Sequence, residues 1–181
     1  MAVDRAHAFA RASRAYEWGR ARHAAVFAIP LLALSVVAAR LGAAPALAVA
    51  LGGALLVATW FCFWRGQTWG RAVVPGVMAG LIPLACSVAA RSYGHVCTGS
   101  ECFSLCIPAC TFGGILAGFI IARTGRRAAS RGRFFVSASV LAVLVGAFGC
   151  SCVGVGGVAG LGVGLVVTLV PAAFGPFRIV E

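Results

Sequence analysis

The chain has 181 residues, of which 61% are hydrophobic and 10% are charged, and its mean hydropathy is +1.00. A soluble domain of this size cannot bury so much apolar surface, so the composition excludes one and indicates a polytopic helical membrane protein. The formal charge of +11 comes from 15 basic residues, all arginine, against four acidic ones. In such a protein, arginines gather in cytoplasmic loops beside anionic lipid head groups, so we expect no nucleic-acid partner.

Residues 1–23 form a basic arm ahead of the first apolar stretch. Aromatic and arginine side chains recur there at helical spacing, which predicts an amphipathic helix lying on the membrane surface. We interpret the arm as a topological anchor, with the binding of a cytoplasmic partner as the alternative. The residues expected to contact lipid or a partner are Arg5, Arg11, Arg14, Trp18 and Arg22.

Six apolar stretches follow, each long enough for a transmembrane helix. They are expected at about 24–40, 45–64, 72–90, 104–122, 134–150 and 157–177, with residues 178–181 as a short tail. The last two are separated by a glycine-rich turn between Gly149 and Gly157, because the uncharged stretch containing both is too long for one span. The predicted fold class is therefore all-α, an integral membrane protein with six transmembrane helices in a compact bundle.

The arginines predict the orientation of this bundle. With the N-terminus inside, 13 of the 15 arginines fall in inner loops and tails, which leaves only Arg40 and Arg91 outside. Positive charge favours the cytoplasmic side, so both termini are expected there, and an inner-membrane location in a bacterium is predicted. The loop after the fourth span is expected to contact lipid or a partner through Arg123, Arg126, Arg127, Arg131 and Arg133.

Glycines spaced by four residues recur in three predicted spans. The pairs are Gly76 with Gly80 and Gly114 with Gly118, and the last span has Gly156, Gly160 and Gly164. Such spacing allows two helices to cross closely, which favours a compact bundle. The spacing leaves the oligomeric state open.

Seven of the eight cysteines are expected near the outer side of the membrane. We interpret Cys62, on the inner side, and Cys86 as small packing residues. The remaining six, with one histidine, are candidates for disulfides or for a zinc or copper site: Cys97, Cys102, Cys106, Cys110, Cys150, Cys152 and His95. Disulfide connectivity cannot be deduced from spacing. None of these cysteines forms a C-x2-C pair, the usual arrangement in metal sites and thiol-redox enzymes, which weakens both of those readings.

The sequence around these cysteines is consistent with two starting points for the fourth transmembrane helix. Pro108 favours a helix that begins near Ile107, because proline fits the first helical turn. Alternatively, the sequence from Thr98 to Glu101 is a capping box, and the helix begins there with Cys102, Cys106 and Cys110 along one face.

Catalytic patterns are missing from the sequence. No Asp, Glu, Lys or His falls inside a predicted span, and there is no phosphate-binding loop or Ser/His/Asp set. We therefore expect a protein that is not an enzyme and has no catalytic residues.

The layout of six spans, a short inner arm and outer cysteines resembles the NrsF-type negative regulators of extracytoplasmic-function sigma factors. The residues that carry the resemblance are Cys97 and Cys102 after the third span and Cys150 after the fifth. The resemblance implies a sensor whose outer thiols report oxidants or metal and whose inner side holds a cytoplasmic regulatory protein. A carrier of thiophilic metal ions and a structural subunit of a membrane complex are the alternatives.

Overall fold

A computed structural model describes residues 15–19, 22, 25–26, 29, 33, 36, 45–93, 95–98, 101–104, 106–150 and 155–174. The first predicted span and the arm therefore lie largely outside the described residues, as do residues 178–181. Within the arm, residues 15–19 are helical, as the amphipathic pattern predicted.

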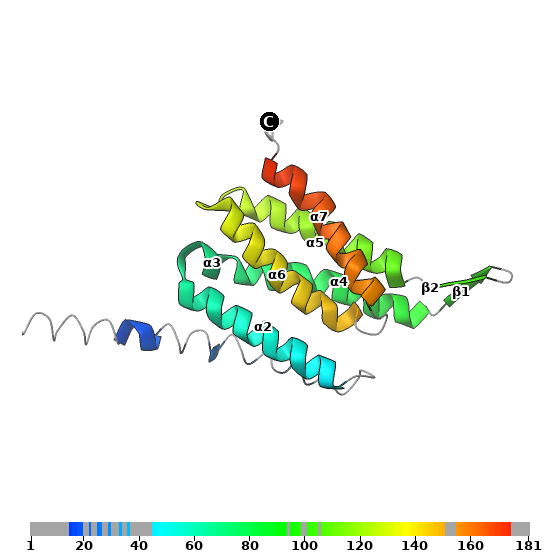
Figure 1. The fold of residues 1–181 in the computed structure, drawn as a ribbon, viewed down its shortest axis with the longest axis horizontal. Coiled ribbons are helices and arrows are strands. Elements are labelled where there is room, and N and C mark those ends of the chain that lie inside the picture. Colours follow the sequence, from blue (N-terminus) through cyan, green and yellow to red (C-terminus); the bar gives the residue numbers. More distant parts are fainter. Residues whose placement is uncertain are drawn as a thin grey trace, which may run out of the picture.

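Five long helices make up most of the described chain (Figure 1). They are α2 (Pro45–Arg65), α4 (Val73–Tyr93), α5 (Cys106–Gly125), α6 (Arg131–Cys150) and α7 (Val155–Phe174). Each is long and apolar enough to cross a membrane. The described part of the chain is thus a helical bundle of the multi-pass membrane type.

Three short elements join these helices. The single-turn helix α3 (Gln67–Arg71) follows α2, and the strands β1 (His95–Thr98) and β2 (Glu101–Ser104) form an antiparallel hairpin between α4 and α5. Figure 1 shows this hairpin projecting beyond one end of the bundle.

Helix α6 lies at the centre of the bundle, and 61% of its apolar, membrane-spanning stretch is buried by the other helices. Helix α4 packs against both α5 and α6, α7 packs mainly against α5, and α2 packs mainly against α6. One core cluster joins α4, α5, α6 and α7 around Ile121, Ala138 and Leu161, and a second joins α2, α4 and α6 around Leu55 and Leu141. The apolar interior therefore consists of two clusters, and α4 and α6 contribute to both.

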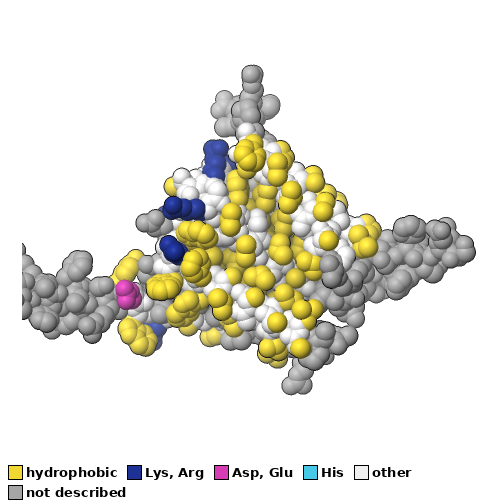
Figure 2. Space-filling view, viewed as in Figure 1, with side chains coloured by type: hydrophobic (Ala, Val, Ile, Leu, Met, Phe, Trp, Pro, Cys, Tyr) yellow, Lys and Arg dark blue, Asp and Glu magenta, His cyan; other side chains and the backbone are white. Residues whose placement is uncertain are grey.

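The outer surface of the bundle is also apolar. Large side chains on several helices face outward, among them Val57 (70% exposed), Phe119 (58%) and Val167 (60%). Figure 2 shows hydrophobic side chains covering the face between the arginines and the opposite end. A soluble monomer rarely exposes a continuous apolar surface of this extent, whereas lipid tails are a suitable solvent for it.

Glycine sets the closest contacts between α5 and α7. A Cβ atom at Gly114 would lie 2.5 Å from the carbonyl oxygen of Leu161, and one at Gly164 would collide with the carbonyl oxygen of Thr111. A Cβ at Gly118 would overlap the side chain of Thr168. The two backbones therefore approach directly, as the glycine spacing predicted.

A second set of close contacts surrounds α4. A Cβ at Gly76 or Gly80 would lie 2.8 Å from a carbonyl oxygen of α6. Pro83, which is fully buried, occupies the space left by Gly113 of α5 and Gly146 of α6. Because the four glycines carry no side chain, α4 packs closely against both α5 and α6.

Several sequence expectations differ from the structure in detail. The helix expected from residue 104 begins at Cys106, because residues 101–104 belong to β2. Helix α6 begins at Arg131 rather than at residue 134, and α7 begins at Val155 rather than at residue 157, while the predicted end of that span at residue 177 lies outside the described residues. In α6 the additional residues are Arg131, Gly132 and Arg133, which a search for apolar runs leaves out although they continue the helix.

The glycines expected in the turn before the last span are partly helical. Gly149 belongs to α6, and a Cβ there would meet Ser87 and lie 3.1 Å from the Cα of Leu84 in α4. Gly156 already belongs to α7. These glycines serve helix packing, whereas residues 151–154 lie outside the described part of the chain.

Candidate functional site: two chemically distinct ends of the bundle

The connections of the bundle place arginines at one end. Helix α2 ends at Arg65, α3 ends at Arg71, α5 ends at Gly125 and α6 begins at Arg131, all at the same end. The described arginines there are all exposed: Arg65, Arg71, Arg123, Arg126, Arg127, Arg131 and Arg133. Figure 2 shows several of them along one edge of the bundle. Together they form the arginine end.

A tight turn concentrates five of these charges. The backbone N–H of Ala128 donates to the carbonyl oxygen of Gly125 at 3.1 Å, and the N–H of Phe134 donates to that of Ser130 at 3.1 Å. Gly125 lies against the buried rings of Phe134 and Phe135, where a side chain would not fit. The turn is thus anchored to the core, and its arginines present a fixed basic surface to anionic groups.

Aromatic side chains border the same end. The ring of Trp69 meets that of Phe61 edge-on at 5.9 Å between centroids, and the guanidinium carbon of Arg65 lies 5.3 Å from the Phe61 centroid. Trp60 and Trp64 are exposed beside them. Aromatic rings that hold arginines in this way are typical of the membrane–water interface.

Gly66 determines how the chain turns there. Its φ of 64° and ψ of −157° fall in a region that only glycine adopts readily. The N–H of Gly66 donates to the carbonyl oxygen of Cys62 at 3.1 Å, which closes α2, and α3 begins at the next residue. The sequence analysis predicted neither this turn nor the contact between Arg65 and Phe61. Glycine is a common turn residue, so Gly66 in the sequence R-G-Q-T-W-G-R (residues 65–71) indicated a turn there.

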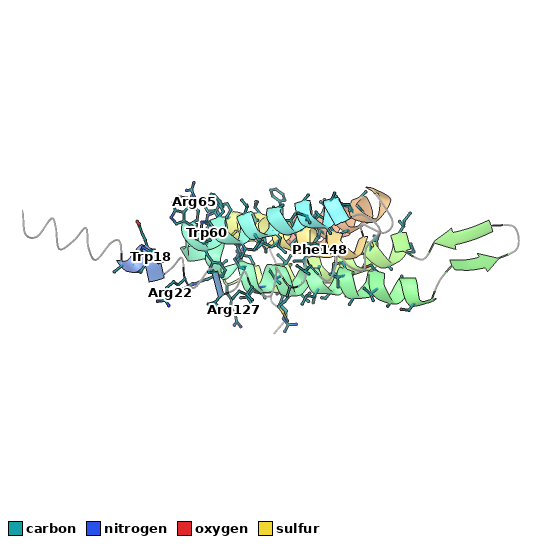
Figure 3. The ribbon with its side chains drawn as sticks, turned by 90° about the horizontal axis from the view of Figure 1, so that it is seen from below. Trp18, Arg22, Trp60, Arg65, Arg127 and Phe148 are labelled. Carbon is teal, nitrogen blue, oxygen red and sulfur yellow. The ribbon has the colours of Figure 1, made fainter. Side chains whose placement is uncertain are left out.

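The arm residues are placed in part. Trp18 and Arg22 are exposed and lie toward the arginine end (Figure 3). The predicted lipid or partner contacts at Arg5, Arg11 and Arg14 lie outside the described residues.

The cysteine-rich segment lies at the opposite end of the bundle. Helix α4 ends at Tyr93, the β1–β2 hairpin follows, and α5 begins at Cys106, while α6 ends at Cys150 (Figure 1). We call this the cysteine end. Five candidate residues therefore share one end of the bundle by backbone placement: His95, Cys97, Cys102, Cys106 and Cys150. Cys152 lies outside the described residues.

The hairpin places two cysteines opposite one another. In its register, Thr98 pairs with Glu101, Cys97 with Cys102, Val96 with Phe103 and His95 with Ser104. Only Gly99 and Ser100 separate the strands in sequence.

The hairpin contradicts the capping-box reading, and Cys102 is not part of a helical stripe with Cys106 and Cys110. Valine, threonine and phenylalanine favour strands, and Gly-Ser between two short runs is a hairpin signal that the sequence reading missed. Helix α5 begins one residue before Ile107, with Pro108 in its first turn, close to the other reading.

The other described cysteines are packed within helices. Cys110 is fully buried in α5, Cys62 is 4% exposed beside Leu55 and Val73, and Cys86 is half-buried in α4. Their positions suit small apolar packing residues. Cys110 was a predicted disulfide or metal residue, and the structure places it in the interior of the bundle.

Hydroxyl groups inside the bundle mostly bond to their own helices. Ser137 donates to the carbonyl oxygen of Arg133 at 2.8 Å, Ser87 to that of Leu84 at 2.7 Å, and Thr168 to that of Gly164 at 3.1 Å. Thr59, which is 1% exposed, has no hydrogen-bond partner among the described residues. Most of these hydroxyls therefore satisfy helix carbonyls and do not form polar links between helices.

No group of three His, Cys, Asp or Glu side chains that could hold a metal ion occurs among the residues described in full. The side chains of His95, Cys97, Cys102, Cys106, Cys150 and Cys152 are outside that set, so the predicted zinc or copper site stays a prediction.

The chain matches no family model, and no curated protein or solved structure shows significant similarity to it.

Proposed function

We propose that the protein is a bacterial inner-membrane sensor or regulator. Cysteines on its periplasmic face respond to thiol oxidants or to thiophilic metal, and its arginine end holds a cytoplasmic regulatory protein. The observation that carries the proposal is the separation of two chemistries: a cysteine-bearing hairpin at one end of the bundle and seven exposed arginines at the other. The protein acts without catalysing a reaction.

The proposed orientation follows from charge. Arginines are retained on the cytoplasmic side during insertion, so the turn between α5 and α6 faces the cytoplasm. The hairpin and the end of α6 then face the periplasm, where disulfides form and exchange. A first span formed by residues 24–40 brings the number of spans to six and places both termini inside.

The connection between the two ends runs through α4 and α5. The hairpin joins the end of α4 to the start of α5, and α5 continues to the arginine turn. The two helices touch where Gly113 meets Pro83, and the crossing of α5 with α7 is lined by Gly114, Gly118 and Gly164. Small shifts of packed helices are an established way to pass a signal, and backbones in direct contact move together.

The arginine end suits an acidic protein surface. The guanidinium group binds carboxylates through two parallel hydrogen bonds, and several arginines held by one turn select a cluster of acids. The resemblance to NrsF-type regulators adds the proposal that the partner is a sigma factor of the extracytoplasmic-function class.

The test replaces Cys97, Cys102, Cys150 and Cys152 by serine in the full-length protein. In right-side-out vesicles loaded with the soluble partner, an oxidant that cannot cross the membrane should release the partner from the native protein and not from the variant. The matched control is Cys62→Ala, which removes a thiol near the arginine end and should leave release unchanged. Equal release from native protein and quadruple variant would overturn the proposal.

A further inference from the structure

The hairpin at the cysteine end brings together two residues that are five positions apart in sequence. Cys97 of β1 and Cys102 of β2 are direct partners in the antiparallel register. Directly opposed residues in such a pair have Cα atoms about 4.5 to 5.5 Å apart, whichever hydrogen-bonding position they occupy. Both separations fall within the range of about 4.4 to 6.8 Å that a disulfide requires.

We propose that Cys97 and Cys102 form a reversible cross-strand dithiol/disulfide pair, and that this pair is the oxidant-responsive site of the protein. The inference rests on the proposed function for its location on the periplasmic side. It deepens that function by naming the pair that reacts and the reaction that it undergoes.

The placement of the other cysteines favours this pairing. Cys62 and Cys110 are buried in α2 and α5, and Cys86 is half-buried in α4. Cys106 is the first residue of α5 and Cys150 the last of α6, so each belongs to a helix rather than to the hairpin. Among the described residues, Cys97 and Cys102 are the two cysteines that the register sets face to face.

The pairing is local to one hairpin, which makes it suited to reversible chemistry. Closing it joins two strands that already lie side by side, and the bond then acts on the end of α4 and the start of α5, which the hairpin connects. A bond between the hairpin and the end of α6 would instead tie two connections of the bundle together.

The oxidant is a small-molecule or protein disulfide in the periplasm. One of the two thiolates attacks a sulfur of that disulfide, forms a mixed disulfide and releases one thiolate. The second hairpin thiolate attacks the mixed disulfide at the hairpin sulfur and releases the other. In total, the hairpin dithiol loses two protons and two electrons, and the oxidant is reduced to two thiols.

The sequence allows a direct test by peptide mapping. Arg91 and Tyr93 precede Cys97, Glu101 separates the two cysteines, and Phe103 separates Cys102 from Cys106. Full-length protein in membranes is equilibrated in glutathione buffers of defined potential and alkylated. It is then cleaved after Tyr93, Glu101 and Phe103. The expected product is peptide 94–101 disulfide-linked to dipeptide 102–103, and dithiothreitol should separate them.

The titration gives a quantitative prediction. The ratio of linked to alkylated peptide should change about tenfold for each 30 mV of buffer potential, as for a two-electron couple. In Cys97→Ser, Cys102 should be alkylated in reducing buffers and carry only a mixed disulfide with glutathione in oxidising ones, with no linked peptide, and Cys102→Ser should do the same for Cys97. The control Cys86→Ser should leave the titration unchanged.

Three results would overturn the pairing. The first is a link from Cys97 or Cys102 to Cys106, Cys150 or Cys152. The second is full alkylation of both thiols in all buffers. The third is alkylation that appears only after a metal chelator is added, which would assign the two cysteines to a metal ion.

The same variants separate this inference from the proposed function. If the linked peptide forms but Cys97→Ser releases the partner as the native protein does, the pair stands and its role as the sensor fails. If no link forms but release still depends on Cys150 or Cys152, the sensor stands and the hairpin pair fails.

Discussion

The arginine end and the cysteine end are joined by the same helices but are built differently. At the arginine end, the turn is fixed to the core by Gly125 against two phenylalanine rings, and Gly66 closes α2 in a conformation that glycine alone adopts readily. At the cysteine end, the chain leaves the bundle as a two-stranded hairpin. One end is therefore a basic surface whose turn is packed against the core, whereas the other extends outward and carries cysteines. This difference suits reception of a signal at the hairpin and retention of a partner at the arginines.

The largest expected effect concerns the sides on which the two ends lie. In a cysteine-free background, a variant that keeps only Cys97 should react with a membrane-impermeant maleimide in intact spheroplasts. A variant that carries only Ala129→Cys, in the arginine turn, should react only after permeabilisation, because arginines hold that turn inside. Labelling is measured by the mass shift of the protein. The opposite pattern would invert the assignment of the ends.

The next largest effect is expected on stability, at the crossing of α5 and α7 within the bundle that separates the two ends. Gly164→Ala should lower the free energy of unfolding by about 3 kcal/mol, because the added Cβ collides with the backbone of α5. Gly162→Ala is the matched control in the same helix, since nothing lies within 4 Å of a Cβ there. It should change stability by no more than about 0.5 kcal/mol. Denaturant unfolding in bicelles measures both, and equal losses would show that α5 and α7 do not cross at Gly164.

A smaller effect is expected at the turn of the arginine end. Gly66→Ala should cost about 2 kcal/mol, because the φ of 64° with an extended ψ strains any residue that has a Cβ. Gly70→Ala is the control, since its Cβ would make ordinary contacts at 3.7 Å and 3.8 Å. Thermal unfolding in detergent measures the difference. A control as unstable as Gly66→Ala would show that the loss does not come from backbone conformation.

The smallest effect concerns the aromatic border. Phe61→Leu should cost about 0.5 to 1 kcal/mol, because Arg65 loses the face of the ring and Trp69 loses its edge-on partner. Phe119→Leu, on the outward face of α5, should cost less. If the two variants unfold at the same temperature, the Phe61 ring contributes nothing beyond its apolar area.

The sequence alone determined the class of the fold and the approximate positions of the five long helices. Hydropathy is summed over about 20 residues, so errors at single positions cancel, and these five helices lie where apolar runs predicted them. Glycine spacing also predicted close crossings, which the structure places at Gly76, Gly80, Gly114 and Gly164. These signals are local or periodic and therefore readable from one chain.

Only the tertiary structure decided which helices meet and which cysteines face each other. Six cysteines and His95 were equal candidates in sequence, because spacing along the chain does not give the distance between residues of separate elements. The fold buries Cys110 in the interior of the bundle and sets Cys97 opposite Cys102 through the pairing of two strands. Pairing register depends on contacts between segments, which is why it appears only when the chain is folded.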